Sequence, residues 1–227
     1  MLFLLIFLWP IIFECTKIVY KSYDNKIKIS SNITSGSHAI ISVIIGMGSY
    51  YTINETLITY SSLLSLSYYI WDTYYIILNK IHKEYIYLYH HFVAFFLLSN
   101  ILNINNSSRY LLFYSLILAE ISNFSLYPVY HYTKILDHSD KVNRDFLFNL
   151  KLAQMIWYFC IRVIILGYIN YYYGSIIPFF LRSFITSIYI MGVYWAMSQI
   201  RSLFGEYVVL TSETIKDNKN RDPPKSL

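Results

Sequence analysis

Charged side chains are scarce in this sequence, and their scarcity excludes an ordinary soluble domain. Aspartate, glutamate, lysine and arginine make up 14% of the 227 residues, whereas a typical soluble domain contains about a quarter. Hydrophobic residues account for 56% and aromatic residues for 19%, and the mean hydropathy is +0.42. Apolar runs of about 20 residues, each long enough for the ~30 Å core of a bilayer, leave no stretch for a separate soluble domain.

Cysteine and histidine are also too few for several classes of site. The two cysteines, Cys15 and Cys160, each lie inside an apolar run, so the sequence suggests neither a disulfide framework nor a thiolate zinc site. A di-iron desaturase or hydroxylase would need H-x-x-x-H and H-x-x-H-H boxes, and the six histidines form neither. The net charge of +5 comes mostly from residues between and after the apolar runs, which is typical of membrane topology. We therefore expect no metal, no cofactor and no nucleic-acid partner.

Seven apolar segments can be recognised, each bounded by charged residues, asparagines or glycines: 2–20, 36–53, 57–79, 85–103, 109–131, 147–173 and 176–204. The first has no basic start and no small-residue cleavage site, and Lys17 follows its apolar core. These features favour a retained signal anchor over a removed signal peptide. The sequence predicts an all-α polytopic membrane protein, a bundle of six to seven transmembrane helices around a polar interior.

The segments that connect these runs alternate in charge. One set carries Lys17, Lys21, Lys26, Lys28, Lys80, Lys83, Lys134, Lys141, Arg144, Lys216, Lys219, Arg221 and Lys225, and the other carries only Arg109. Because cytoplasmic loops are enriched in lysine and arginine, we expect a lumenal N-terminus and a cytosolic C-terminus. The chain then divides into a signal-anchor helix with a basic cytosolic loop (1–35), a transmembrane domain (36–205) and a disordered cytosolic tail (206–227).

Ionisable side chains inside the runs are the candidate functional residues. Hydrocarbon penalises each by about 2.5 to more than 10 kcal/mol, so they normally face a bundle interior and pair there. Polar residues three, four or seven positions away share a helix face with them. The predicted ligand-binding residues are His38, Asp72, His90, His91, Glu120, Asn123, Arg162 and Tyr194. The helical rise places the ionisable residues in one layer and predicts a polar chamber that opens toward the cytosolic leaflet. Interhelical hydrogen bonding alone is the alternative explanation.

Several short strings occur in an order that resembles a known family. They are Ser37-His38-Ala39, Ser67-Tyr68-Tyr69-Ile70-Trp71-Asp72, His90-His91, Glu120-Ile121-Ser122-Asn123, Arg162 after an aromatic run, and Tyr194-Trp195. Over residues 36–205 the chain resembles the TLC-domain family, which includes translocating-chain-associating membrane proteins, ceramide synthases and lipid-sensing proteins. Ceramide synthases follow their histidine pair with a His-Asp-x-x-Asp segment in a helix, and the corresponding span lacks it. A similar string, Asp137-His138-Ser139-Asp140, lies in a charged loop. The resemblance is therefore closer to the non-synthase branch.

The resemblance implies a protein of the endoplasmic reticulum or Golgi that binds membrane lipids and senses, transports or adjusts membrane lipid composition. The alternative is an acyl-CoA-dependent N- or O-acyltransferase, similar to a ceramide synthase, with acyl-CoA and a sphingoid base as substrates. In that enzyme His91 would be the general base, because an imidazole has a pKa near neutrality, with His90 and Asp72 as its catalytic neighbours. A third possibility is a non-catalytic helical scaffold for other membrane proteins.

Overall fold

The computed structural model describes residues 2–79, 85–103 and 107–220, and within these ranges every regular element is a helix. The elements are α1 (Leu2–Val19), α2 (Lys26–Thr52), α3 (Glu55–Leu78), α4 (Tyr85–Asn103), α5 (Ser107–Asn123), α6 (Leu126–Ile135), α7 (Lys141–Tyr158), the π-helix η1 (Phe159–Ile165), α8 (Leu166–Tyr173), the 3-10 helix η2 (Gly174–Ile176) and α9 (Phe179–Asn220). The predicted all-α class is confirmed for these ranges.

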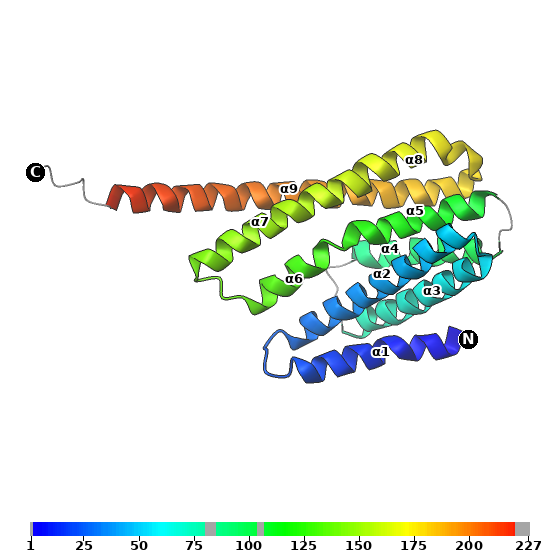
Figure 1. The fold of residues 1–227 in the computed structure, drawn as a ribbon, viewed down its shortest axis with the longest axis horizontal. Coiled ribbons are helices and arrows are strands. Elements are labelled where there is room, and N and C mark those ends of the chain that lie inside the picture. Colours follow the sequence, from blue (N-terminus) through cyan, green and yellow to red (C-terminus); the bar gives the residue numbers. More distant parts are fainter. Residues whose placement is uncertain (1, 80–84, 104–106, 221–227) are drawn as a thin grey trace, which may run out of the picture.

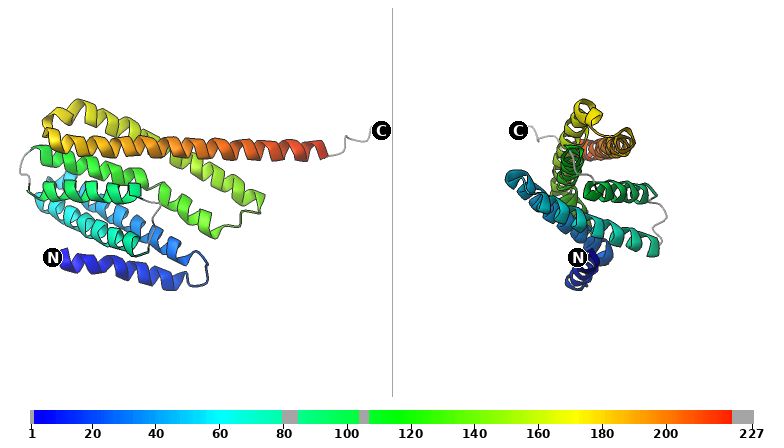
Figure 2. Two further views of the ribbon diagram at one scale, coloured as in Figure 1. Left: turned by 180° about the vertical axis from the view of Figure 1, so that it is seen from behind. Right: turned by 90° about the vertical axis from the view of Figure 1, so that its right-hand side faces the viewer.

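The helices lie side by side in one bundle, with α1 at one edge and α8 and α9 at the other (Figure 1). Helix α1 packs against α2 and α3, α3 packs against α4, and α5 contacts both α2 and η1. Helix α9 contacts α4, α7 and η1 and then continues past the loop between α6 and α7 (Figure 2). An ion pair between Lys151 of α7 and Glu206 joins the two helices.

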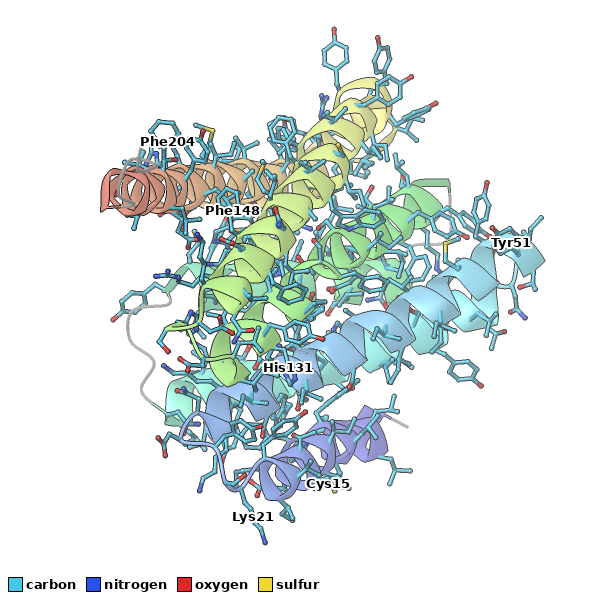
Figure 3. The ribbon with its side chains drawn as sticks, turned by 60° about the vertical axis from the view of Figure 1, so that its left-hand side comes forward. Cys15, Lys21, Tyr51, His131, Phe148 and Phe204 are labelled. Carbon is cyan, nitrogen blue, oxygen red and sulfur yellow. The ribbon has the colours of Figure 1, made fainter. Side chains whose placement is uncertain are left out.

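The two ends of the bundle differ in charge. The α1–α2 and α6–α7 turns lie at the same end, and the α2–α3 and α8–α9 turns lie at the other (Figure 1). Lys21 and Tyr51 mark these opposite ends in Figure 3. Most basic residues of the described loops therefore gather at the α1–α2 end, whereas Lys80 and Lys83 lie outside the described residues. The opposite end carries Arg109 and Arg182, whose guanidinium lies against Gly174.

Local capping explains where two of the helices begin. The Asn54 side chain accepts a hydrogen bond from the Thr56 N–H at 2.9 Å, and Asp140 accepts one from the Val142 N–H at 3.0 Å. Such caps satisfy backbone donors that the first turn of a helix leaves unpaired. At the end of α2, Ile53 has a left-handed φ of 51°, a conformation that a β-branched residue rarely adopts.

Helix α2 begins earlier than the sequence predicts, at Lys26 instead of residue 36. Hydropathy does not identify this first part because it contains lysines, serines and an asparagine. The polar groups are nevertheless satisfied: Ser30 donates to the Lys26 carbonyl at 2.8 Å, and the Asn32 amide donates to the Tyr127 carbonyl at 3.0 Å. Residues 26–35 thus belong to a helix of the bundle, which differs from the predicted division of the chain at residue 35.

Two other predicted segments are interrupted. Segment 109–131 divides into α5 and α6 around Phe124 and Ser125. Pro128 accounts for the division, because a proline ring clashes with the carbonyl four residues before it, here that of Phe124. Segment 147–173 begins at Lys141 and contains the π-helix η1.

The structure also differs from the sequence prediction at the C-terminal end. Helix α9 continues to Asn220, where the sequence predicts a disordered tail from residue 206. No glycine or proline occurs between Gly205 and Pro223, so nothing in that stretch breaks the helix. Residues 221–227 of the predicted tail lie outside the described residues.

Four stretches of the described chain are long and apolar enough to cross a membrane: Tyr85–Asn103, Ser108–Ile135, Lys141–Ile176 and Phe179–Ser212. The larger predicted number of six to seven spans stays a prediction. Helix α2 places apolar side chains outside and polar side chains inside, as expected of a helix that faces lipid. Ile40 and Ile44 are exposed, while Ser42 and Ser49 are fully buried.

Candidate functional site

Tyr69 lies at the centre of a buried polar cluster formed by α2, α3, α4 and α5. Its hydroxyl donates a hydrogen bond to Glu120 Oε1 at 2.7 Å. Its ring lies 5.2 Å from the His91 ring and 5.6 Å from the His38 ring, measured between centroids. The structure therefore brings together His38, His91 and Glu120, which the sequence places in three different segments.

His91 and Asp72, both predicted site residues, lie close together. His91 Nε2 lies 3.3 Å from Asp72 Oδ2, and His91 Nδ1 lies 3.3 Å from the Thr73 hydroxyl. Both partners of the pair are buried. A carboxylate beside one ring nitrogen and a hydroxyl beside the other hold the imidazole in one orientation.

His38 is enclosed by aromatic and hydroxyl side chains. Its ring stacks on Tyr68 with centroids 4.1 Å apart and planes 8° apart. Its Nε2 atom lies 3.1 Å from Ser65 Oγ, which is 3.0 Å from Ser42 Oγ. The fully buried Trp9 of α1 packs edge-on against His38 at 5.6 Å. Serines of α2 and α3 thus join the two helices around this ring.

Arg162 and His90 lie beside the cluster. Arg162 is 1% exposed on η1. Its Nε and Nη1 atoms have no hydrogen-bond partner within the described part of the chain. The His90 ring lies 5.7 Å from the Trp195 ring of α9 and 6.0 Å from that of Tyr69.

Two predicted site residues lie away from these contacts. Tyr194 is 60% exposed on α9, because the buried face of that helix carries Ile188 and Met191, so its assignment to the site is corrected. The neighbouring Trp195 contacts His90 instead. Asn123 is half-buried at the last position of α5, next to the break before α6.

Sequence reasoning missed Trp9, Tyr69 and Thr73 as members of the site. The sequence offers one indication for Trp9: its indole N–H is a polar group in a run of aliphatic and phenylalanine side chains. Its indole N–H donates to Ser67 Oγ at 2.8 Å. Tyr69 and Thr73 adjoin residues that the sequence singled out, but their polar atoms are recognisable as part of the cluster only when the helices are packed.

Two pockets flank α5. The larger, of about 480 Å³ counted to its open edge, lies between α4, α5, α8 and α9 and is lined by Leu97, Leu112, Ser115, Leu116, Ala119, Leu166, Ile169, Asn170, Ile177, Ile185, Ile188 and Tyr189. The smaller, of about 280 Å³, is lined by Ser61, Ser65, Tyr69, Leu98, Phe113, Leu116, Ile117 and Glu120. Leu116 borders both, so the apolar pocket and the polar cluster adjoin each other.

The larger pocket does not match the predicted polar chamber. Its residues Leu97, Leu112 and Ile177 lie near the end of the bundle where α8 turns into α9. That end is opposite to the one where the basic loops gather. The polar cluster itself is closely packed by its own aromatic rings. The larger of the two pockets beside the cluster is therefore mostly apolar.

The Asp137–Asp140 string serves the α6–α7 turn. Asp137 Oδ1 accepts a hydrogen bond from the Ser139 N–H at 2.9 Å, and this bond lowers the pKa of the Asp137 carboxyl. Asp140 caps α7. The string therefore has a local structural role outside the bundle interior. Within the described ranges no group of three or more His, Cys, Asp and Glu side chains is placed to hold a metal ion.

No family model, curated protein or solved structure matches this chain.

Proposed function

We propose that this chain is a membrane protein that binds the acyl chain of a lipid inside its helical bundle and thereby senses, transports or adjusts membrane lipid composition. The pocket between α4, α5, α8 and α9 carries the proposal. Apolar walls with a few polar groups are the usual composition of a ligand site, and here Ser115, Asn170 and Tyr189 supply the polar groups.

Asn170 indicates where a ligand could bind within that pocket. Its Nδ2 atom donates to the Thr186 hydroxyl at 3.2 Å, whereas its Oδ1 atom is buried without a partner among the described residues. A buried acceptor without a donor costs free energy. A hydroxyl or amide group of a ligand would satisfy it.

Two observations support a location in the membrane: the four long apolar stretches, and the exposed apolar and buried polar side chains of α2. We propose six or seven spans: α2 and α3 cross the bilayer alongside the four, and α1 is the seventh if it crosses too. The gathering of lysines at the α1–α2 end supports a lumenal N-terminus and a cytosolic C-terminus. Residence in the endoplasmic reticulum or Golgi rests on the resemblance to the TLC-domain family alone.

A matched pair of substitutions on α9 tests the pocket. Ile188 lines it and is buried, whereas Ile190 is exposed on the same helix. Ile188→Phe should remove co-purifying lipid, measured by mass spectrometry of extracts from purified protein, and Ile190→Phe should retain it. Wild type that carries no lipid above the detergent background, or equal lipid in both variants, would contradict the proposal and favour the scaffold alternative.

The His91–Asp72 pair favours an acyl-CoA-dependent acyltransferase as the second candidate. His91 would take the proton from an amine or hydroxyl that attacks the thioester carbonyl, and Asp72 would stabilise the resulting imidazolium. The carbon–sulfur bond breaks, and the CoA thiolate leaves and takes a proton. Release of free CoA by the purified protein, lost in His91→Ala and reduced about a hundredfold or more in Asp72→Asn, would support this activity. Absence of turnover by the wild type would exclude it for the acyl-CoA and acceptor supplied.

A further inference from the structure

Arg162 occupies an unusual position in the backbone. It lies in the middle of the π-helix η1 (Phe159–Ile165), and π-helical turns are rare and occur frequently at functional sites. Gly192 of α9 lies directly against it, because a Cβ atom at that position would come within 2.6 Å of Arg162 Cγ. A π-helix and a glycine together therefore make room for a guanidinium in the bundle interior.

Two of the three guanidinium nitrogens of Arg162 are unsatisfied. The Nε and Nη1 atoms are buried and have no hydrogen-bond partner within residues 2–79, 85–103 and 107–220. Glu120, a candidate counter-charge, accepts a hydrogen bond from Tyr69, and no ion pair joins it to Arg162 in those ranges. A buried charge that lacks a partner is strongly unfavourable.

The unpaired groups lie at one end of the apolar pocket. Leu166, one turn after Arg162 on the same continuous helix, lines the pocket. Ile188, one turn before Gly192 on α9, lines it too. One helical turn corresponds to about 5 Å. The guanidinium is therefore placed just beyond the apolar pocket, on the side of the polar cluster.

We propose that Arg162 binds the oxyanion, a carboxylate or a phosphate, of the lipid whose acyl chain occupies this pocket. The inference rests on the proposed lipid-binding function and specifies the chemical class of the lipid as an anionic amphiphile. A guanidinium presents parallel N–H donors that match the oxygens of either group. Tyr158 is 1% exposed, and its hydroxyl lies beside the Arg162 side chain, within reach of the same oxyanion.

The test measures equilibrium binding of three tritiated probes to full-length protein in non-ionic detergent. Palmitate carries a carboxylate, dipalmitoyl phosphatidate carries a phosphate, and methyl palmitate has the acyl chain without the charge. Wild type should bind at least one of the two anions about tenfold or more tightly than methyl palmitate. The anion that is preferred identifies the source of the oxyanion.

Arg162→Gln should reduce the binding of the preferred anion to the level of methyl palmitate, and Arg162→Lys should retain part of the preference. Unchanged binding of methyl palmitate by Arg162→Gln shows that this variant is folded. Equal binding of the anions and the ester by wild type, or an anion preference that survives in Arg162→Gln, would overturn the role of Arg162. If wild type binds none of the probes, the lipid-binding function itself fails.

Discussion

The indole N–H of Trp9 donates a hydrogen bond to the hydroxyl of Ser67 at 2.8 Å, across 58 residues of sequence. Trp9 is fully buried, and its ring also packs edge-on against Tyr68 at 5.4 Å. The first helix is therefore attached to the polar cluster by both a hydrogen bond and aromatic packing.

We expect Trp9→Phe to destabilise the protein by about 1–3 kcal/mol, because it removes a buried hydrogen bond and leaves part of the indole volume empty. Thermal unfolding of the detergent-solubilised protein measures the change. Phe7→Leu on the exposed face of α1 is the matched control and should have little effect. A Trp9→Phe variant as stable as this control would show that α1 contributes little to the bundle.

The hydrogen bond from Tyr69 to Glu120 should couple the two residues energetically. Hydrogen bonds to charged groups contribute about 1.5–3 kcal/mol, so Tyr69→Phe and Glu120→Gln should each destabilise the protein and the double variant should lose less than the sum. A double-mutant cycle on thermal or denaturant unfolding measures the coupling. Additivity within about 0.5 kcal/mol would mean that the contact does not contribute to stability.

Two glycines of α9 should respond to alanine in opposite directions. At Gly192 the added methyl group would meet Arg162 Cγ at 2.6 Å, whereas at Gly205 it would meet nothing within 4 Å. Gly192→Ala should destabilise the protein by about 1–3 kcal/mol through overpacking. Gly205→Ala should stabilise it by up to about 1 kcal/mol, because alanine is the better helix former. The melting temperatures of the two variants measure these changes. A higher melting temperature for Gly192→Ala would contradict the close contact between Gly192 and Arg162.

Ile53 should be replaceable with a gain in stability. Its φ of 51° is left-handed, and its side chain is largely exposed. A non-glycine residue pays about 1–2 kcal/mol for this conformation, so Ile53→Gly should raise the melting temperature despite the greater freedom of glycine in the unfolded chain. The same substitution at the exposed helical Ile44 is the control and should lower it. A lower melting temperature for Ile53→Gly would contradict the expectation.

Features of the fold were predictable from the sequence where a single physical rule determines them. The bounds of α3 and α4 agree with the predicted segments to within a few residues, because an apolar run between polar loops indicates where a span begins and ends. Asp72 and His91 were expected in the interior because hydrocarbon excludes lone charges, but their pairing is seen only in the structure. Tyr194 was misplaced, since spacing on one helix does not show which face a neighbouring helix covers.

Other features depend on information that hydropathy does not carry. Trp9 is apolar by composition, yet its one polar atom is what joins α1 to Ser67. The break after α5 was readable from Pro128, whose steric effect reaches back to Phe124. The sequence around Arg162 carries no signal for a π-helix, and the close approach of Gly192 depends on how α9 packs against it. The position of the larger pocket likewise depends on how α4, α5, α8 and α9 pack.

The length of α9 has a mechanical consequence. At about 1.5 Å per residue, its 42 residues extend about 63 Å, roughly twice the thickness of a bilayer core. Gly192 and Trp195, which touch Arg162 and His90, belong to the same stiff rod as its projecting outer end. A force or a rotation applied near Asn220 would therefore be transmitted along α9 and would shift Gly192 and Trp195 relative to Arg162 and His90.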